Sequence, residues 1–404
     1  MKKKGTGYFF AILLCPLLAS AAGAATMTLT GLDVLERDGF RELDGKRVGL
    51  ITNQSALDLD GNNAADVFAK AGNFKLAAIF SPEHGFRGTA EGGVLIGNST
   101  DPVTGAPVYS LYGKTKRPTP EMLKGLDILV FDIQDIGARF YTYLTTMGYA
   151  MEEAAKAGVP FMVLDRPNPI GGVIEGPVLE PDIRDFTAYY PVPVRHGLTA
   201  GEMAFLHKEN LKLNLVLDVV KMENWDHSMF FDQTGLIWTD PSPNIRDTES
   251  EVLYPGLGCF EASNVSVGRG TPEPFHWFGA PWIKAGKIAR ALNEARLPGV
   301  KFRTRALKPS SDLYAGRKCP GVEIAVTDET SVRALDIFVR AAWLLKKYNG
   351  KEFELKPFEI RKMTGTPDFY RMLEAGASPD EILALFHRES AEFKASSAKF
   401  LLYK

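Results

Sequence analysis

Short apolar runs, each followed directly by polar residues, recur through the first half of the chain. They lie at residues 46–53, 75–80, 127–133 and 159–164. The third run is almost continuously apolar, which is typical of a strand buried on both faces of a sheet. Segments with helical spacing alternate with the runs, notably residues 63–71 and 140–154, which are followed closely by Gly72 and Gly158. This alternation predicts an α/β fold, a parallel doubly wound sheet with helices on both faces.

Two further features extend this pattern. Thr199 and Glu202 have the spacing of a capping box at the start of another helix, and residues 213–220 are expected to form another strand. Residues 81–120, between the second and third strands, are rich in Gly, Pro and Thr and predict a long loop. Loops of this length are often functional.

The pattern changes near residue 249. Residues 254–282 are crowded with Gly, Pro and aromatic residues. Beyond them we expect helices at residues 283–295 and 331–348, strands near residue 302 and at 322–326, and a final helix that begins at Ser378. The chain is therefore expected to hold an N-terminal domain at residues 26–248 and a smaller C-terminal α+β domain at residues 249–404.

The first 25 residues have the order of a secretory signal peptide. Three lysines precede an apolar stretch at residues 8–18, and small residues follow, with Ala22-Gly23-Ala24 as a cleavage site. The alternative is a membrane anchor, but the apolar stretch is far shorter than the ~20 residues that a span requires. We expect residues 1–25 to be removed and the mature protein to be periplasmic or secreted, without a membrane segment.

Composition excludes several classes of function. The net charge of −2 over 404 residues, without a basic tail, gives no indication of nucleic-acid binding. Outside the leader the cysteines are Cys259 and Cys319, which form either a disulfide or two buried thiols. The sequence lacks zinc-ligand spacing, a G-x-S-x-G elbow, a P-loop and a complete G-x-G-x-x-G motif. We therefore expect neither a metal nor a cofactor.

Polar side chains follow each of the four apolar runs. They are Asn53, Glu83, His84, Asp132, Gln134, Asp135, Asp165, Arg166 and Asn168. In a parallel sheet these positions meet at one edge, where ligands bind. Carboxylates, amides and an arginine suit a polyhydroxylated ligand. The alternative interpretation is that these residues only cap helices and turns.

Glu83 is the leading candidate for a general acid. It lies on a tight turn near Phe80 and Phe86, and partial burial favours the protonated form of a carboxyl group. His84 either contacts the substrate or stabilises the turn. Arg139, at the start of the following helix, is a candidate to bind a carboxylate of the ligand. Further candidates for this role are Arg166, Arg195, Arg246 and Arg269.

Six ordered motifs resemble those of one protein family. They are S-P-E-H-G at 81–85, F-D-I-Q-D-I-G-A-R-F-Y-T-Y at 131–143, L-D-R-P-N-P at 164–169, I-E-G-P at 174–177, P-S-P-N at 241–244 and G-R-G-T at 268–271. On these motifs the chain, from about Gly45 onward, resembles the exo-β-N-acetylmuramidases, a family of bacterial glycoside hydrolases.

The resemblance implies an activity and a site. Such enzymes release N-acetylmuramic acid from the non-reducing end of peptidoglycan fragments during cell wall turnover. Their fold is a Rossmann-like N-terminal domain plus a smaller domain, with the site in the cleft between them. The family's leading catalytic candidate falls on Glu83, and Asp135 or Glu175 is our candidate for a second carboxylate. Asn244 and Arg269 become candidates for substrate binding.

Other functions remain open at this point. A non-catalytic periplasmic binder of muropeptides or wall sugars has a similar two-domain pattern, and only turnover distinguishes it from a hydrolase. A wall amidase or esterase is disfavoured by the missing serine elbow and metal-ligand spacing. The sequence does not determine the oligomeric state.

Overall fold

The structure is a computed structural model that describes residues 2, 27–88, 94 and 97–404. The predicted leader, apart from Lys2, lies outside the described residues. Within those described, no helix combines the length and the apolar character needed to cross a membrane.

In the described part of the chain, seven strands form a large sheet in the order β3-β4-β2-β1-β5-β6-β7. Every neighbouring pair is parallel except β3 with β4. The strands are β1 (Arg47–Thr52), β2 (Lys75–Ser81), β3 (Ser99–Thr100), β4 (Pro107–Ser110), β5 (Ile128–Asp132), β6 (Phe161–Leu164) and β7 (Leu217–Val220). The predicted doubly wound sheet is thus confirmed.

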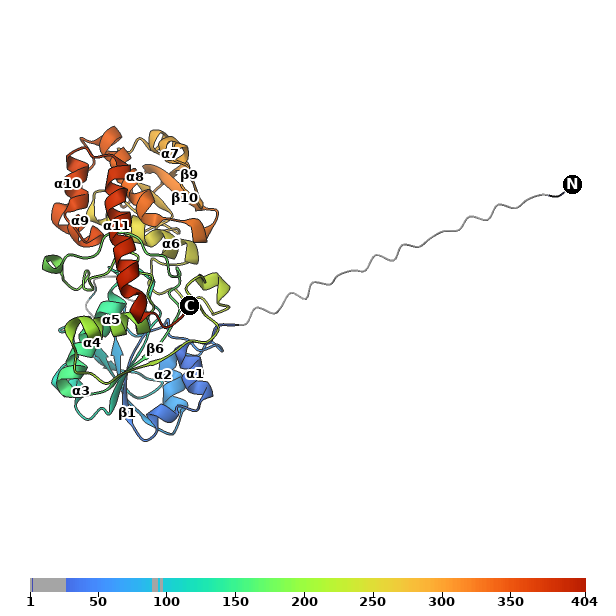
Figure 1. Ribbon diagram of the computed structural model, residues 1–404, viewed down its shortest axis with the longest axis vertical. Coiled ribbons are helices and arrows are strands. Elements are labelled where there is room, and N and C mark those ends of the chain that lie inside the picture. Colours follow the sequence, from blue (N-terminus) through green and yellow to red (C-terminus); the bar gives the residue numbers. More distant parts are fainter. Residues whose placement is uncertain (1, 3–26, 89–93, 95–96) are drawn as a thin grey trace.

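Helices cover both faces of this sheet (Figure 1). One face packs against α1 (Gly31–Arg37) and α2 (Ala64–Lys70), and the other against α3 (Pro120–Leu123), α4 (Thr142–Ala157) and α5 (Ala200–Leu211). Local signals set the helix ends. Gly158 ends α4 in the left-handed region with φ of 68°, and the capping box of Thr199 and Glu202 begins α5.

The segment at residues 81–120 is more structured than a plain loop. Its short strand β4 pairs in parallel with β2, with Ile79 beside Val108 and Phe80 beside Tyr109. A run of four residues is too short for its alternation to be recognised in the sequence. The strand extends the sheet beside the turn that carries Glu83.

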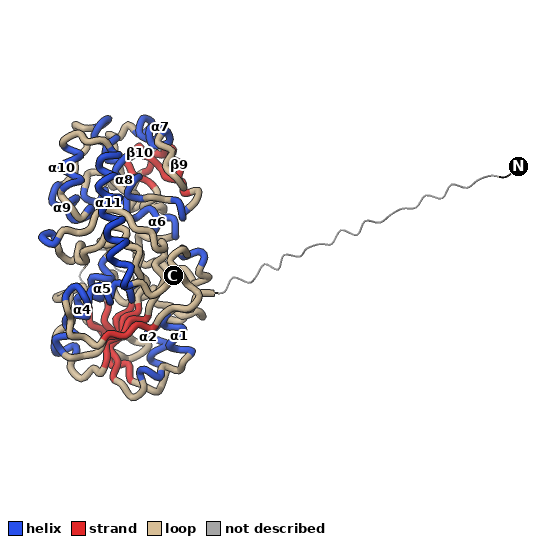
Figure 2. Tube along the Cα trace, viewed as in Figure 1, coloured by secondary structure: helices blue, strands red, loops and turns tan. Residues whose placement is uncertain are grey.

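The C-terminal part is built on a small antiparallel sheet in the order β8-β10-β9 (Figure 2). Its elements are α6 (Thr248–Leu257), β8 (Trp277–Gly279), α7 (Ala285–Glu294), β9 (Val300–Leu307), β10 (Cys319–Val326), α8 (Ala334–Asn349), α9 (Pro357–Thr364), α10 (Asp368–Glu374) and α11 (Pro379–Ser397). Helix α11 begins at the predicted cap Ser378. Cys259 and Cys319 are both buried, unpaired thiols.

The two parts share one continuous apolar core. Phe140, just before α4, packs edge to face on Tyr254 of α6 with ring centroids 5.3 Å apart. Helix α11 returns the chain toward the large sheet (Figure 1), where the Tyr403 hydroxyl donates a hydrogen bond of 2.7 Å to Asp165. The C-terminus therefore attaches the small-sheet part to the large-sheet part.

A buried ion pair joins the same two parts. Arg195 Nη1 lies 2.7 Å from Glu175 Oε1, and both side chains are almost completely buried. Glu175 Oε2 also accepts a hydrogen bond from the Leu335 amide at the start of α8, and Arg195 donates to the Val332 carbonyl. Charges removed from water need such partners, so this pair constrains how the two parts are placed.

We predict that Glu175→Gln strongly destabilises the protein, because it leaves the Arg195 charge buried without a counterion. The expected loss in free energy of unfolding is ~3–5 kcal/mol, measured by urea denaturation. Glu209→Gln is the matched control, since its partner Lys399 is 60% exposed. Exposed pairs contribute at most ~1 kcal/mol. Equal losses in the two variants would contradict the bridging role of Glu175.

Candidate active site

An open cleft of about 960 Å³ lies where the two parts meet. This volume suits a ligand of the size of one or two sugar units. Four segments line it: the turn after β2, the segment before α6, the loop before β8 and the loop between β9 and β10. The lining residues are Glu83, Asn244, Arg246, Arg269, Gly270, Thr271, Pro272, Ser310, Ser311 and Asp312.

Hydroxyl groups hold the Glu83 carboxyl group at the wall of the cleft. Thr142, the first residue of α4, donates a hydrogen bond of 2.7 Å to Glu83 Oε2. Burial, followed by the Glu83 charge and a hydrogen bond to it, raises the pKa of Tyr112 to about 12. Tyr112 therefore keeps its proton at neutral pH and can donate it toward the same carboxyl group. The position of Glu83 is thus determined by α4 and by the segment after β4.

The Glu83 turn has an unusual backbone. His84 and Gly85 both adopt the left-handed region, with φ of 70° and 80°. His84 is 9% exposed, and its ring packs edge to face against Tyr143 at 6.5 Å. It does not line the main cleft but lies beside it, in a neighbouring cavity of about 320 Å³. The histidine therefore supports the turn from behind.

A row of aromatic rings connects this turn to the C-terminal side of the cleft. Tyr143 packs on Tyr141 at 4.7 Å, Tyr141 on Tyr254 at 6.2 Å, and Tyr254 on Phe275 at 4.7 Å. All three contacts are edge to face, the arrangement that aromatic quadrupoles favour. The Arg269 guanidinium lies 5.3 Å from the Phe275 ring. The row fixes the distance between Glu83 and the loop that carries Arg269.

The Gly-Arg-Gly-Thr motif forms the turn that carries Arg269. Thr271 donates its amide to the Gly268 carbonyl at 3.0 Å, and Arg269 is paired with Glu261. Gly270 has φ of 77°, and a Cβ there would lie 2.6 Å from the Ser311 carbonyl oxygen. Glycine at position 270 therefore permits the β9–β10 loop to approach and to bring Asp312 into the cleft.

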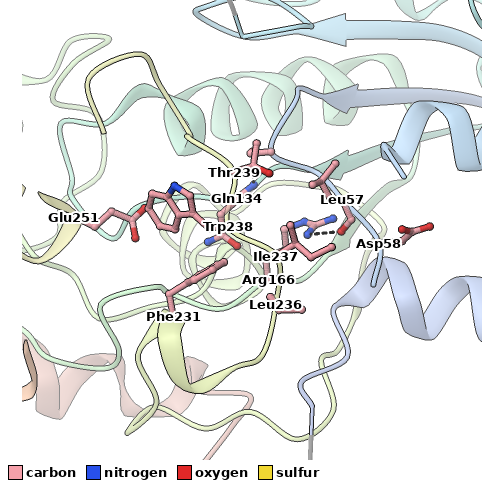
Figure 3. Close-up of a pocket in the computed structure, with 11 residues that line it drawn as sticks. Leu57, Asp58, Gln134, Arg166, Phe231, Leu236, Ile237, Trp238, Thr239 and Glu251 are labelled. Carbon is pink, nitrogen blue, oxygen red and sulfur yellow. Dashed lines mark hydrogen bonds between the residues drawn. The ribbon is translucent and has the colours of Figure 1, made fainter. Parts of the chain in front are cut away.

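Most of the predicted strand-end residues do not face the cleft. Arg166 forms a buried two-pronged ion pair with Asp132, and the Gln134 amide donates to the Pro167 carbonyl. Figure 3 shows Gln134 and Arg166 at a separate cavity that Trp238 helps to enclose. Its volume of about 20 Å³ suits a single water molecule. The segment that carries Trp238 therefore covers this part of the sheet edge.

The other strand-end residues satisfy the backbone around them. Asn53 accepts from the Ser55 amide, Asn168 donates to the Leu198 carbonyl, and Asp165 accepts from the Gly201 amide at the start of α5. Capping and turn formation, the alternative raised by the sequence, therefore describes their contacts.

Arg139 is also occupied by backbone groups. It donates to the carbonyls of Pro177 and Val192 in the N-terminal part and Met363 in the C-terminal part. Burial lowers the pKa of Arg139 to about 10, so it remains charged at neutral pH. Arg139 therefore links the two parts of the chain and does not line the cleft.

The sequence-based candidates for a second carboxylate lie outside the cleft lining. Asp135 is 7% exposed, accepts from the Gly137 amide at 2.8 Å and lies 3.5 Å from His196 Nε2. Glu175 is committed to Arg195 and to the start of α8. Of the predicted site residues, the structure brings Glu83, Asn244 and Arg269 together in the cleft.

Sequence reasoning missed several groups at the site. Tyr112 and Thr142 hold Glu83, and Asp312 adds charge to the cleft. Asp312 lies in a loop far from any strand-end signal. Arg246, which also lines the cleft, was one of several arginines that the sequence offered for a ligand carboxylate. In the part of the chain that is described, no group of His, Cys, Asp and Glu has an arrangement that could hold a metal ion.

Comparison with protein families accounts for both parts of the chain. Residues 48–249 match the N-terminal part, and residues 252–403 the C-terminal part, of the family described as exo-beta-N-acetylmuramidase NamZ. The chain belongs to the NamZ family. A similar protein is the peptidoglycan beta-N-acetylmuramidase NamZ of Bacillus subtilis (strain 168), which is 44% identical over 376 residues, covering 93% of this chain and 91% of that protein.

Two solved structures share the NamZ-family fold. Both are DUF1343 family proteins from Bacteroides fragilis NCTC 9343. One has a TM-score of 0.88 at 37% identity, and the other 0.77 at 30%. Each comparison covers 94% of this chain and 99% of the solved chain. The resemblance noted in the sequence motifs is therefore confirmed, as is the fold that it implied.

We predict a pH-dependent contribution to stability from Asp165 in this NamZ-family protein. Burial raises the pKa of Asp165 to about 6, despite hydrogen bonds from Tyr403, Gly201 and Thr199. Between about pH 4 and about pH 6 the folded protein retains a proton that the unfolded chain has lost, so this part of the stability falls as pH rises. Above about pH 6 the contribution no longer changes.

The measurement is the free energy of unfolding at about pH 4.5 and about pH 7.5. Asp165→Asn should show a smaller decrease between these values than the wild type, because the titrating group is gone. Asp218→Asn, at an exposed position of β7, should retain the wild-type decrease. An unchanged decrease in Asp165→Asn would refute the assignment.

Proposed function

We propose that this protein is an exo-acting glycoside hydrolase that releases terminal N-acetylmuramic acid from the non-reducing end of peptidoglycan fragments. The observation that carries the proposal is Glu83, held by hydroxyl groups at the wall of an open cleft in a chain of the NamZ family. The Bacillus subtilis relative, a peptidoglycan beta-N-acetylmuramidase, supports the same bond and sugar.

Glu83 acts in this proposal as the general acid. It gives its proton to the glycosidic oxygen as the bond to the muramic acid ring breaks, which prevents an alkoxide from leaving. A positioned acid of this kind contributes typically ~10²–10⁴ in rate. The hydroxyls of Thr142 and Tyr112 then stabilise the carboxylate that remains, because both can donate hydrogen bonds to it.

Asp312 is the second carboxylate of the proposed mechanism. Of the described residues that line the cleft, Glu83 and Asp312 carry the carboxyl groups, and they enter from opposite parts of the chain. The Asp312 backbone lies in the left-handed region, with φ of 63°. Two residues earlier in the same loop, the amide and the hydroxyl of Ser310 both donate to the Gly270 carbonyl and hold the loop against the turn that carries Arg269. Asp312 either attacks the anomeric carbon directly or activates a water molecule that does so.

Export completes the proposal. The signal-like residues 1–25 would direct the enzyme to the compartment in which wall fragments are exposed. The mature chain would act in the periplasm or in the medium on muramic-acid-containing fragments.

Glu83→Gln should lower kcat on a chromogenic N-acetyl-β-muramide by ~10²–10⁴-fold, because glutamine cannot supply the proton. The measurement is initial rate of chromophore release, together with the melting temperature of each variant. Glu121→Gln, on the surface helix α3, is the control and should retain wild-type turnover. Native activity in Glu83→Gln would remove Glu83 from the mechanism.

Turnover also separates the hydrolase from a binder. A binder of wall sugars would give a stoichiometric heat of binding in calorimetry and release no free sugar. Mass analysis of the products from a defined disaccharide makes this comparison. The hydrolase should release muramic acid in many-fold excess over the protein.

Asp312→Asn should also reduce kcat by at least ~10²-fold, while the control Asp44→Asn, at an exposed position distant from the cleft lining, should not. NMR of the first-formed sugar anomer in the wild type then defines the role of Asp312. Retention indicates direct attack, and inversion indicates activation of water. A wild-type rate in Asp312→Asn would exclude both roles.

A further inference from the structure

The cleft contains two arginines that differ in how their charge is used. Arg269 is paired with Glu261 and lies over the Phe275 ring. Arg246 is exposed, and within residues 27–88 and 97–404 it forms no ion pair. The charge of Arg269 is therefore already compensated, while that of Arg246 is available to a ligand in the cleft.

Backbone carbonyls hold the Arg246 guanidinium in place. Its Nε donates to the Pro243 carbonyl at 2.9 Å, and its Nη1 approaches the carbonyls of Thr271 and Pro272 at 3.3 Å each. These contacts bridge the segment before α6 and the loop before β8. They orient the side chain without neutralising it, and no hydrogen bond within the described residues uses Nη2.

A fixed guanidinium without a counterion is suited to a carboxylate. Its unused Nη2 can donate a charge-assisted hydrogen bond to a carboxylate oxygen. Because the side chain is already oriented, little conformational entropy is lost when the ligand binds. The cleft also holds the neutral side chains of Asn244 and Ser311 and the carboxyl groups of Glu83 and Asp312. Within the described residues, the partners of Arg246 are backbone carbonyls and neither of these carboxyl groups.

The chemistry of the proposed substrate supplies such a carboxylate. N-acetylmuramic acid differs from N-acetylglucosamine by the lactyl ether on its third hydroxyl group, which ends in a carboxylate. We propose that Arg246 binds this lactyl carboxylate and thereby determines the choice of muramic acid over N-acetylglucosamine. This inference rests on the proposed function and adds to it the residue that distinguishes the two sugars.

The test compares three chromogenic substrates: the N-acetyl-β-muramide, its lactyl methyl ester and the N-acetyl-β-glucosaminide. Arg246→Gln should lower kcat/KM on the muramide by about 10- to 100-fold, the value of a hydrogen bond to a charged group. The same substitution should change kcat/KM on the neutral ester and on the glucosaminide by less than about 3-fold, because neither presents a carboxylate.

Two further variants make the result specific. Arg246→Lys should fall between wild type and Arg246→Gln on the muramide, since lysine keeps the charge but lacks the planar group that the backbone carbonyls orient. Arg290→Gln, at an exposed position of α7, should behave as wild type on all substrates. A merely structural role for Arg246 would lower activity on all three substrates alike, and that outcome would overturn the inference.

Two other outcomes are also decisive. Loss of discrimination in Arg269→Gln, with discrimination retained in Arg246→Gln, would overturn the assignment to Arg246. If wild type cleaved none of the substrates, the proposed function would fail instead. Calorimetry would then compare the binding of free N-acetylmuramic acid and free N-acetylglucosamine to wild type and to Arg246→Gln. If wild type prefers N-acetylmuramic acid and Arg246→Gln does not, the inference is supported. If Arg246→Gln keeps this preference, the inference is overturned.

Discussion

The buried pair of Glu175 and Arg195 is the constraint on which the rest of the structure depends. Both charges lie away from water, so each requires the other. Glu175 also binds the first turn of α8, and Arg195 reaches the carbonyl of Val332 just before it. The pair thereby places the C-terminal part relative to the large sheet. A cleft whose walls come from both parts needs such a fixed connection.

Polar residues at the carboxyl ends of the large sheet's strands also hold the two parts of the chain in position. Asp132 and Arg166 neutralise each other under the segment that carries Trp238, while Arg139 donates to carbonyls from both parts of the chain. Buried polar groups are costly unless they are hydrogen-bonded, so their partners are strictly arranged. What looks in sequence like one continuous binding rim is largely a set of internal connections that hold the loops in position.

The open site lies beyond this edge, on the loops. Glu83 stands between hydroxyl donors from α4 and from the segment after β4, and a row of aromatic rings leads from its turn to Arg269. Arg246 and Asp312 complete the charges of the cleft. In the proposed mechanism, Glu83 is the acid, Asp312 the second carboxylate and Arg246 the group that binds the anion, a combination that suits cleavage of an acidic sugar.

The sequence by itself determined the strands β1, β2, β5, β6 and β7 of the large sheet, the end of α4, the starts of α5 and α11, and the family. These features depend on local signals, namely buried apolar runs, capping residues and a glycine in the left-handed region, which each segment carries within itself. The motif around Glu83 was likewise readable, because a turn at the end of a strand is defined by a few consecutive residues.

Only the tertiary structure decided which polar residues line the cleft. Asp165 and Asp312 are both aspartates in connecting segments, yet Asp165 is buried against the start of α5 and Asp312 lines the cleft. The difference depends on which segments pack over each residue, and those segments are distant in the chain. Burial, charge pairing and the meeting of loops are long-range properties, so the composition of the site could not be read from local patterns.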